Sequence, residues 1–157
     1  MEAAGKHSLQ GGRHGPAAIP PIEDAVERAK LETAIDACVR RFYAKGAEDP
    51  LLGGIFLAID DLDQHMAIVA NFWSKSLLGT ERYQGHPFAA HINLPIEPEH
   101  FTRWLELFSE SANEALPKTQ AEQAIAKAAH MTQCFQAGLF PFTGADGKPS
   151  RVPPAIT

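Results

Sequence analysis

Four side chains with polar tips lie on otherwise apolar helical stripes, so their chemistry would face the interior of the protein. They are Tyr43, His65, His91 and Trp104. A neutral imidazole can ligate a transition metal, whereas phenol and indole groups donate hydrogen bonds. Each of these polar atoms needs a partner if the side chain is buried. Taken singly, each residue also has a purely structural explanation, because all three residue types bury large apolar bodies in ordinary cores.

The spacing of apolar residues predicts one helix that carries Tyr43 and a second helix that carries His65. The first stripe consists of Leu31, Ile35, Val39 and Phe42, and the second contains Val69, Phe72 and Ser76. Residues 45–46, a lysine followed by a glycine, are expected to end the first helix. An aspartate at 60–61 is a suitable cap for the second helix, and Gly79 is expected to end it.

A short helix between two prolines carries His91, and a long amphipathic helix carries Trp104. Pro87 stands near the start of the short helix, and Pro95 stops the chain beyond it. Pro98 opens the long helix, because proline is favoured in a first turn. The apolar stripe of the long helix consists of Phe101, Trp104, Leu105, Phe108 and Ala112. Prolines on both sides restrict the backbone around His91, which would help to hold its ring in place.

The rest of the middle of the chain also predicts helix rather than strand. Pro117 breaks the long helix, and residues 119–122 match a capping box that would start a last helix ending at Gly138. Residues 50–56 are expected to form a connection rich in apolar residues. No segment shows the clean alternation of a strand, and no internal repeat is present. The sequence therefore predicts an all-α domain.

The two flanks differ in composition from this helical middle. Residues 1–22 and 142–157 together hold six of the 12 glycines and also many prolines. Such stretches bury too little apolar surface to order themselves. We therefore expect a flexible extension at 1–22, one domain at 23–141 and a flexible tail at 142–157, and the length of 157 residues suits a single domain.

Composition and charge exclude several classes of protein. The chain is 45% hydrophobic with a net charge of −5 and has no basic run, which argues against nucleic-acid binding and a polybasic membrane anchor. No apolar run of about 18 residues and no secretory signal pattern occur, so a cytoplasmic protein outside the membrane is expected. Cys38 and Cys134 are expected to be small buried hydrophobes rather than a disulfide.

A dozen short stretches, in order along the chain, resemble the truncated haemoglobins of group III. The main ones are Phe42-Tyr43, Asp49-Pro50-Leu51-Leu52-Gly53, His65, Asn71-Phe72-Trp73, Leu77-Leu78-Gly79-Thr80, Tyr83-Gln84-Gly85, Pro87-Phe88-Ala89-Ala90-His91, Leu94-Pro95, Glu97-Pro98-Glu99-His100-Phe101 and Trp104. Their ordered combination is far more specific than any one motif. The resemblance implies a truncated globin fold, which is a helical sandwich around a haem.

The resemblance also implies a b-type haem and makes His91 its proximal iron ligand, a role that neutral imidazole has in globins. The other ring nitrogen of His91 should donate to a nearby carbonyl. On the opposite, distal side the resemblance places Tyr43, His65 and Trp104. Donors there would favour dioxygen over carbon monoxide, because dioxygen on ferrous iron carries partial negative charge. Whether His65 ligates the iron or gates the pocket stays open.

Apolar walls and a polar rim complete the implied pocket. The expected walls are Phe56, Val69, Phe72, Phe88, Ile92 and Phe101, and for Phe42 and Phe135 ordinary core packing is an equal alternative. Candidates for contact with the haem propionates are Arg82, Tyr83 and His86, for which simple solvent exposure is an equal alternative.

The implied function is the binding of dioxygen and other diatomic ligands, either reversibly or with redox chemistry on nitric oxide or peroxide. Redox turnover would need a separate reductase, because the sequence has no GxGxxG fingerprint for a nicotinamide or flavin. One alternative is a cofactor-free helical interaction module. Another is a di-iron bundle, which expects two Glu-x-x-His pairs, and Glu97 with His100 supplies one such pair.

Overall fold

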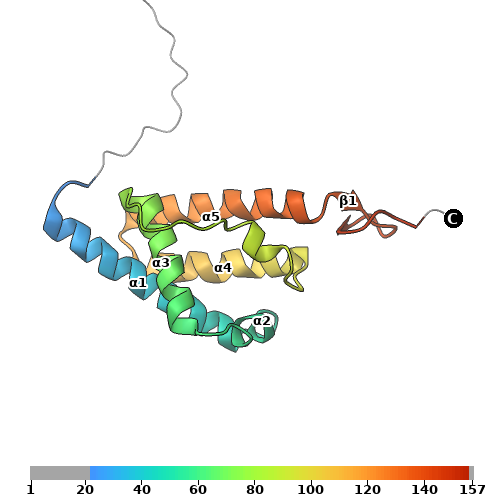
Figure 1. The fold of residues 1–157 in the computed structure, drawn as a ribbon, viewed down its shortest axis with the longest axis horizontal. Coiled ribbons are helices and arrows are strands. Elements are labelled where there is room, and N and C mark those ends of the chain that lie inside the picture. The colour runs from blue at the N-terminus through green and yellow to red at the C-terminus, as the bar shows by residue number, and fades with distance from the viewer. Residues whose placement is uncertain (1–21, 156–157) are drawn as a thin grey trace, which may run out of the picture.

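The computed structural model describes residues 22–155, and helices make up most of that range (Figure 1). The elements in chain order are α1 (Ala25–Glu48), α2 (Gly53–Leu57), α3 (Leu62–Leu78), the 3-10 turn η1 (Ala89–His91), α4 (Pro98–Ala115) and α5 (Lys118–Leu139). The all-α prediction is therefore confirmed. No helix among the described residues is long and apolar enough to cross a membrane. The extension expected at residues 1–22 lies, except for Ile22, outside the described residues.

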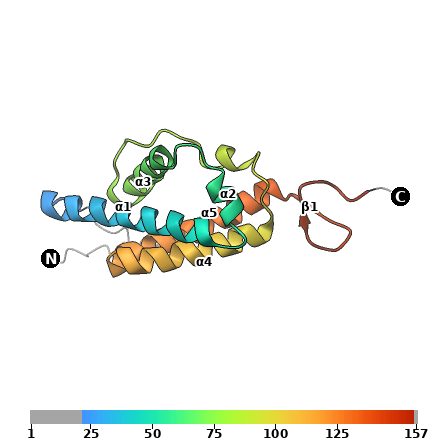
Figure 2. The ribbon, with the colours of Figure 1, turned by 90° about the horizontal axis from the view of Figure 1, so that it is seen from below.

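Four long helices pack around one apolar interior. Helices α4 and α5 form an antiparallel pair, and α3 crosses them (Figure 1). Helix α1 packs on both α3 and α4. Figure 2 shows α3 nearly end-on, beside the layer that α1, α4 and α5 form. The main core includes Leu31, Ile35, Val39, Phe42, Trp73, Leu107 and Phe108. A second, smaller cluster consists of Ile96, Phe101, Leu139 and Phe140.

The ends of α3 agree with the sequence prediction, whereas the end of α1 does not. The Asp61 carboxylate accepts a hydrogen bond from the Gln64 N–H, and Gly79 ends the helix at a φ of 71°. Helix α1 continues past the expected stop at residues 45–46 to Glu48. Gly46 is needed for close packing instead, because a Cβ there would overlap the ring of Phe56.

The stretch expected to be a connection contains the short helix α2. The buried Asp49 carboxylate organises this turn, since it accepts the N–H groups of Leu51 and Leu52, each at 3.0 Å. Its other oxygen accepts from Arg103 Nε of α4 at 2.7 Å. A helix of five residues is too short to show a helical period, and no side-chain hydrogen bond caps its start at Leu52.

The expected capping box at residues 119–122 is wrong, and a different one is present. Helix α5 begins at Lys118 with Pro117 as its N-cap, so the threonine already lies inside the helix. At the start of α4, the Glu97 N–H donates to His100 Nδ1 at 2.9 Å. The Glu-x-x-His spacing is thus explained by helix capping. In the part of the chain that is described, no group of three or more His, Cys, Asp or Glu is placed to hold a metal.

One further expectation needs correction, and one segment contains an element that the sequence does not predict. Cys38 is buried as expected, and burial raises the pKa of its thiol to about 11, but Cys134 is exposed on α5. A flexible tail is expected at 142–157, whereas the structure has a small antiparallel hairpin there. Its strands are β1 (Phe142–Thr143) and β2 (Pro149–Ser150). Two-residue strands are too short to show an alternating pattern in a sequence.

Candidate functional site

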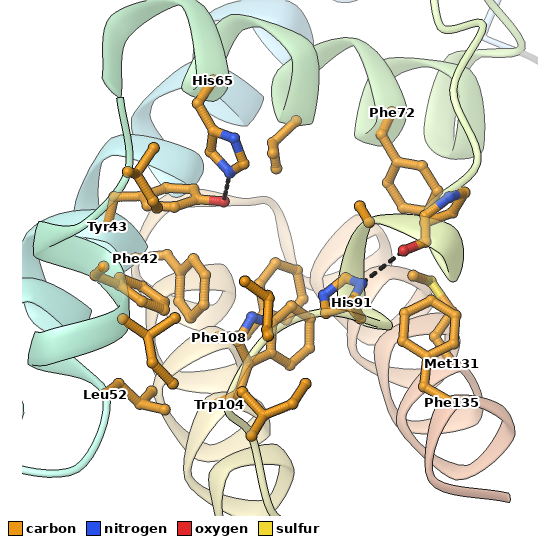
Figure 3. Close-up of a pocket in the computed structure, with 18 of the residues that line it drawn as sticks. Phe42, Tyr43, Leu52, His65, Phe72, His91, Trp104, Phe108, Met131 and Phe135 are labelled. Atoms are coloured by element: carbon orange, nitrogen blue, oxygen red, sulfur yellow. Dashed lines mark hydrogen bonds between the residues drawn. The ribbon is translucent and has the colours of Figure 1, made fainter. Parts of the chain in front are cut away.

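A cavity of about 410 Å³ opens among the helices, and the four polar-tipped residues all lie on its wall (Figure 3). Tyr43 comes from α1, His65 from α3, His91 from η1 and Trp104 from α4. The volume lies in the range of cavities that bind small molecules and cofactors. Residues far apart in the sequence therefore meet at one largely apolar site.

The ring of His91 is fixed by a main-chain acceptor. Its Nδ1 lies 2.6 Å from the carbonyl oxygen of Pro87. Because a carbonyl can only accept, Nδ1 carries the proton and Nε2 keeps its lone pair. Figure 3 shows this second nitrogen turned to the side of the cavity where Tyr43 lies. Phe135 packs against the imidazole with ring centroids 5.0 Å apart. His91 thus presents an oriented lone pair to an apolar cavity.

A hydrogen-bonded pair lies across the cavity from His91 (Figure 3). The hydroxyl of Tyr43 is 2.7 Å from His65 Nε2, and Tyr43 is only 8% exposed. Burial raises the pKa of the Tyr43 hydroxyl. Burial, and secondly the electrostatic effect of the neighbouring His91 ring, lower the pKa of His65. Both members of the pair are therefore neutral near pH 7, and either atom of the bond can be the donor.

Trp104 is the last of the four polar-tipped residues on the cavity wall. Its ring stacks on Phe108 with centroids 5.3 Å apart and an interplanar angle of 6°. The edge of Phe42 meets it at 5.3 Å and 77°. Within residues 22–155 the indole N–H makes no hydrogen bond to another side chain or to the backbone. The indole donor is thus available to a ligand in the cavity.

Most of the residues expected to form the apolar walls line the cavity, but two of them do not. Those on the wall are Phe42, Phe56, Val69, Phe72, Phe101 and Phe135. Phe88 packs instead against Phe135 and over Gly138 of α5, where a Cβ would lie 2.8 Å from the Phe88 ring. Ile92 follows His91 in a 3-10 turn, so its side chain points elsewhere, and it is 45% exposed.

The three candidate rim residues have different surroundings. Tyr83 lines the cavity and meets Phe72 edge-on at 5.2 Å. Arg82 does not face the cavity, because its guanidinium donates to Glu32 at 2.8 Å, to Ser74 at 2.9 Å and to Asn71 at 2.9 Å. It ties the loop to α1 and α3. His86 is not among the lining residues.

Several lining residues were not expected from the sequence. They include Leu52, Ile55, His100, Met131 and Thr132. The first two belong to the region of α2, which has no visible period. His100 is positioned by its bond to the Glu97 N–H, and the capping box was the signal that could have identified it. Met131 and Thr132 lie on α5, whose stripe points at the cavity.

The residues of the cavity fit a haem. One imidazole nitrogen with a lone pair faces the interior, aromatic and aliphatic side chains form the walls, and hydrogen-bond donors lie on the far side. A histidine ligand within an apolar pocket is how globins hold haem iron. An all-helical fold around such a pocket defines the globin class.

Comparison with known proteins identifies the class and then the group. The chain belongs to the bacterial-like globin family, whose model matches residues 26–137. It is 33% identical over 109 residues to the group 3 truncated haemoglobin Ctb of Campylobacter jejuni, an overlap of 66% of this chain and 86% of that one. The crystal structure of the group III truncated haemoglobin from Campylobacter jejuni superposes with a TM-score of 0.65 and 31% identity, over 77% of this chain and 96% of that one. The predicted group and the truncated globin fold are thereby confirmed.

Proposed function

We propose that the protein binds one b-type haem with His91 as the proximal ligand, and that dioxygen and other diatomic molecules bind on the side of Tyr43. The observation that carries this proposal is the geometry of His91. Its Nδ1 donates a hydrogen bond to the Pro87 carbonyl at 2.6 Å, and its Nε2 faces a largely apolar cavity of about 410 Å³. The globin family and this cavity argue against a cofactor-free interaction module.

The distal side chains would hold the ligand by hydrogen bonds. Ferrous haem supplies reversible binding of diatomic gases, and dioxygen becomes partly negative when it binds. Among residues 22–155, the indole N–H of Trp104 has no competing acceptor. Tyr43 can donate into the cavity when His65 Nε2 carries a proton and donates to the phenol oxygen, 2.7 Å away. Each such bond contributes roughly 1–2 kcal/mol, since the acceptor is partly charged. The aromatic walls exclude water.

His65 is assigned a gating and orienting role rather than ligation of the iron. Its Nε2 is engaged with the Tyr43 hydroxyl, so ligation would require breaking that bond. The check is the spectrum of the ferric and ligand-free ferrous protein. A six-coordinate low-spin spectrum that vanishes in His65→Leu would contradict this assignment.

The proposed use of bound dioxygen is redox chemistry on nitric oxide rather than oxygen transport. Two hydrogen bonds would tighten binding by about a hundredfold, at ~1.4 kcal/mol per tenfold. Such slow release disfavours a carrier but leaves time for a second reactant to enter. Each turnover to nitrate then requires an electron, which a separate reductase would deliver. A cytoplasmic location, testable by cell fractionation, accords with that supply.

Two measurements test the proposal. Absorption spectra of the purified, reduced protein with and without carbon monoxide should show a haem band that shifts on binding. Stopped-flow mixing of the oxygenated protein with nitric oxide should give rapid oxidation with nitrate as product. A colourless protein that takes up no haem would contradict the haem proposal. A haem protein with fast oxygen release and slow reaction with nitric oxide would contradict only the redox role.

A further inference from the structure

Arg151, in the C-terminal tail, makes three hydrogen bonds to the backbone that follows His91. Its Nη1 donates to the carbonyl of Ile92 at 2.9 Å, and its Nη2 donates to the carbonyls of Leu94 and Ile96, each at 3.0 Å. The planar guanidinium presents several N–H donors in a fixed fork, so one arginine can bind alternate carbonyls of a bent chain. These bonds connect residues 55 to 59 positions apart.

The segment 92–97, which links η1 to α4, is mostly exposed and held by short-range bonds. Ile92 and Leu94 are 45% and 36% exposed, and only Ile96 is buried, at 6%. The N–H groups of Ile92, Leu94 and Ile96 donate to the carbonyls of Ala89, His91 and Leu94 at 3.4, 3.2 and 2.9 Å, and the Glu97 N–H donates to His100 Nδ1 at 2.9 Å. Segments with little apolar burial open easily. The three bonds from Arg151 thus restrain a part of the chain that burial does not.

Arg151 is itself held in place by the hairpin. The turn between β1 and β2 is closed by the Gly144 N–H, which donates to the Lys148 carbonyl at 2.7 Å, and Gly147 has a φ of 78°. The guanidinium lies over the ring of Phe140, 5.4 Å from its centroid. Phe140 belongs to the same buried cluster as Ile96. The hairpin therefore returns Arg151 to the outer side of the 92–97 segment.

We propose that Arg151 is a positioning residue for His91, and that the hairpin 142–150 holds its side chain as a strap on segment 92–97. The inference rests on the proposed role of His91 as haem ligand. His91 is the last residue of η1, and the three bonds from Arg151 are the long-range restraints on the backbone after it, beside short-range bonds and the burial of Ile96. The family model matches residues 26–137, so the strap lies outside the matched range.

Three substitutions separate the strap from general effects of charge and folding. Arg151→Gln removes the fork, and Gly147→Val disrupts the hairpin turn without touching Arg151, because a β-branched residue disfavours positive φ. Lys148→Gln is the matched control, since it removes one positive charge from the same hairpin. All three positions lie at the surface or in a turn, so the core stays intact.

The experiment has three readouts on the full-length protein. Amide hydrogen exchange reports on segment 92–97, and we expect roughly tenfold faster exchange there in Arg151→Gln. Resonance Raman of the ferrous protein reports on the iron–histidine stretch, which should shift or broaden. Transfer of haem to apomyoglobin should become several-fold faster. Gly147→Val should move all three readouts in the same direction, and Lys148→Gln should leave them at wild-type values.

Each outcome decides a separate statement. Unchanged exchange in Arg151→Gln would overturn the strap. Faster exchange with an unchanged iron–histidine band and unchanged haem transfer would overturn the positioning of His91. Equal effects in Lys148→Gln would reduce the role of Arg151 to its charge and also overturn the proposal. A wild-type protein that takes up no haem would contradict the proposed function, while the exchange experiment would still decide whether Arg151 holds segment 92–97.

Discussion

The two histidines on opposite sides of the cavity have different partners, and the difference decides what each ring can do. His91 Nδ1 is bonded to a main-chain carbonyl, which can only accept. His65 Nε2 is bonded to the phenol of Tyr43, which can donate or accept. The first arrangement fixes one tautomer permanently. The second lets the proton positions of both groups adapt to whatever enters the cavity.

The elements that carry the two histidines differ in a parallel way. His65 lies near the start of α3, a helix of 17 residues with its own aspartate cap and glycine stop. His91 lies on a turn of three residues, so its position depends on contacts with other parts of the chain. Phe88, just before the turn, packs against Gly138 of α5, and Arg151 donates hydrogen bonds to the segment that follows the turn. The proposed ligand lies on a short turn and therefore needs support from other parts of the chain, whereas a residue on a long helix does not.

The largest effect expected from this comparison is that of His91→Gly. Loss of the fixed nitrogen should abolish tight haem retention, or make the iron–ligand bond depend on added imidazole. The haem content, read from the Soret band after gel filtration with and without imidazole, is the measurement. His86→Gly is the matched control, because this nearby loop histidine is not among the cavity-lining residues. Normal haem content and ligand binding in His91→Gly without imidazole would show that another residue holds the iron.

The next largest effect is expected from Tyr43→Phe, which removes the hydroxyl shared by His65 and the ligand. Loss of a hydrogen bond worth roughly 1–2 kcal/mol should speed oxygen release by about tenfold. Stopped-flow oxygen dissociation measures it. Tyr83→Phe changes another tyrosine that lines the cavity, away from the Tyr43–His65 pair, and should leave the rate unchanged. Equal rates in wild type and Tyr43→Phe would remove the adaptable pair from ligand binding.

The same contrast shows how far the sequence predicts this site. Residues on long, regular helices, such as His65 and Trp104, can be placed from periodicity, because each helical stripe has to face the core. Their common cavity could not be derived from periodicity, since helix packing brings together residues from four elements. The ordered family motifs supplied that information. Tyr43 and His91, which those motifs indicated, both line the cavity.

The errors fall where chain geometry is local and irregular. Phe88 and Ile92 flank His91 in sequence, but a 3-10 turn directs them away from the cavity. The α2 helix is hidden because a buried aspartate, rather than a periodic stripe, organises it. Arg82 has the charge expected of a propionate contact, yet its ion pair with Glu32 holds it elsewhere. Such outcomes depend on partners that are distant in the sequence.

Trp104→Phe should have a smaller effect than Tyr43→Phe, because the indole stays in place by stacking and has no polar partner to orient it. Oxygen release should become faster by about fivefold, which corresponds to roughly 1 kcal/mol. The effect in the double variant Tyr43→Phe with Trp104→Phe should be less than the sum, since both donors share one acceptor. Full additivity in stopped-flow dissociation rates would indicate two independent contacts.

The smallest effect expected concerns the dependence of stability on pH. Burial lowers the pKa of His65 below its ordinary value of 6.5, so between those two pKa values the unfolded chain binds more protons than the folded one. The stabilisation from neutral His65 is therefore complete above pH 6.5 and is lost as the pH falls through the folded pKa. His91 faces His65 and opposes its protonation further. The urea unfolding midpoint is measured at pH 7.5 and at about pH 5. Its decrease between the two pH values should be larger in wild type than in His65→Leu, since the leucine does not titrate. Because every other titrating group is common to the two proteins, parallel changes in midpoint would show that His65 accepts a proton without cost, and the distal pair would then be open to solvent rather than enclosed.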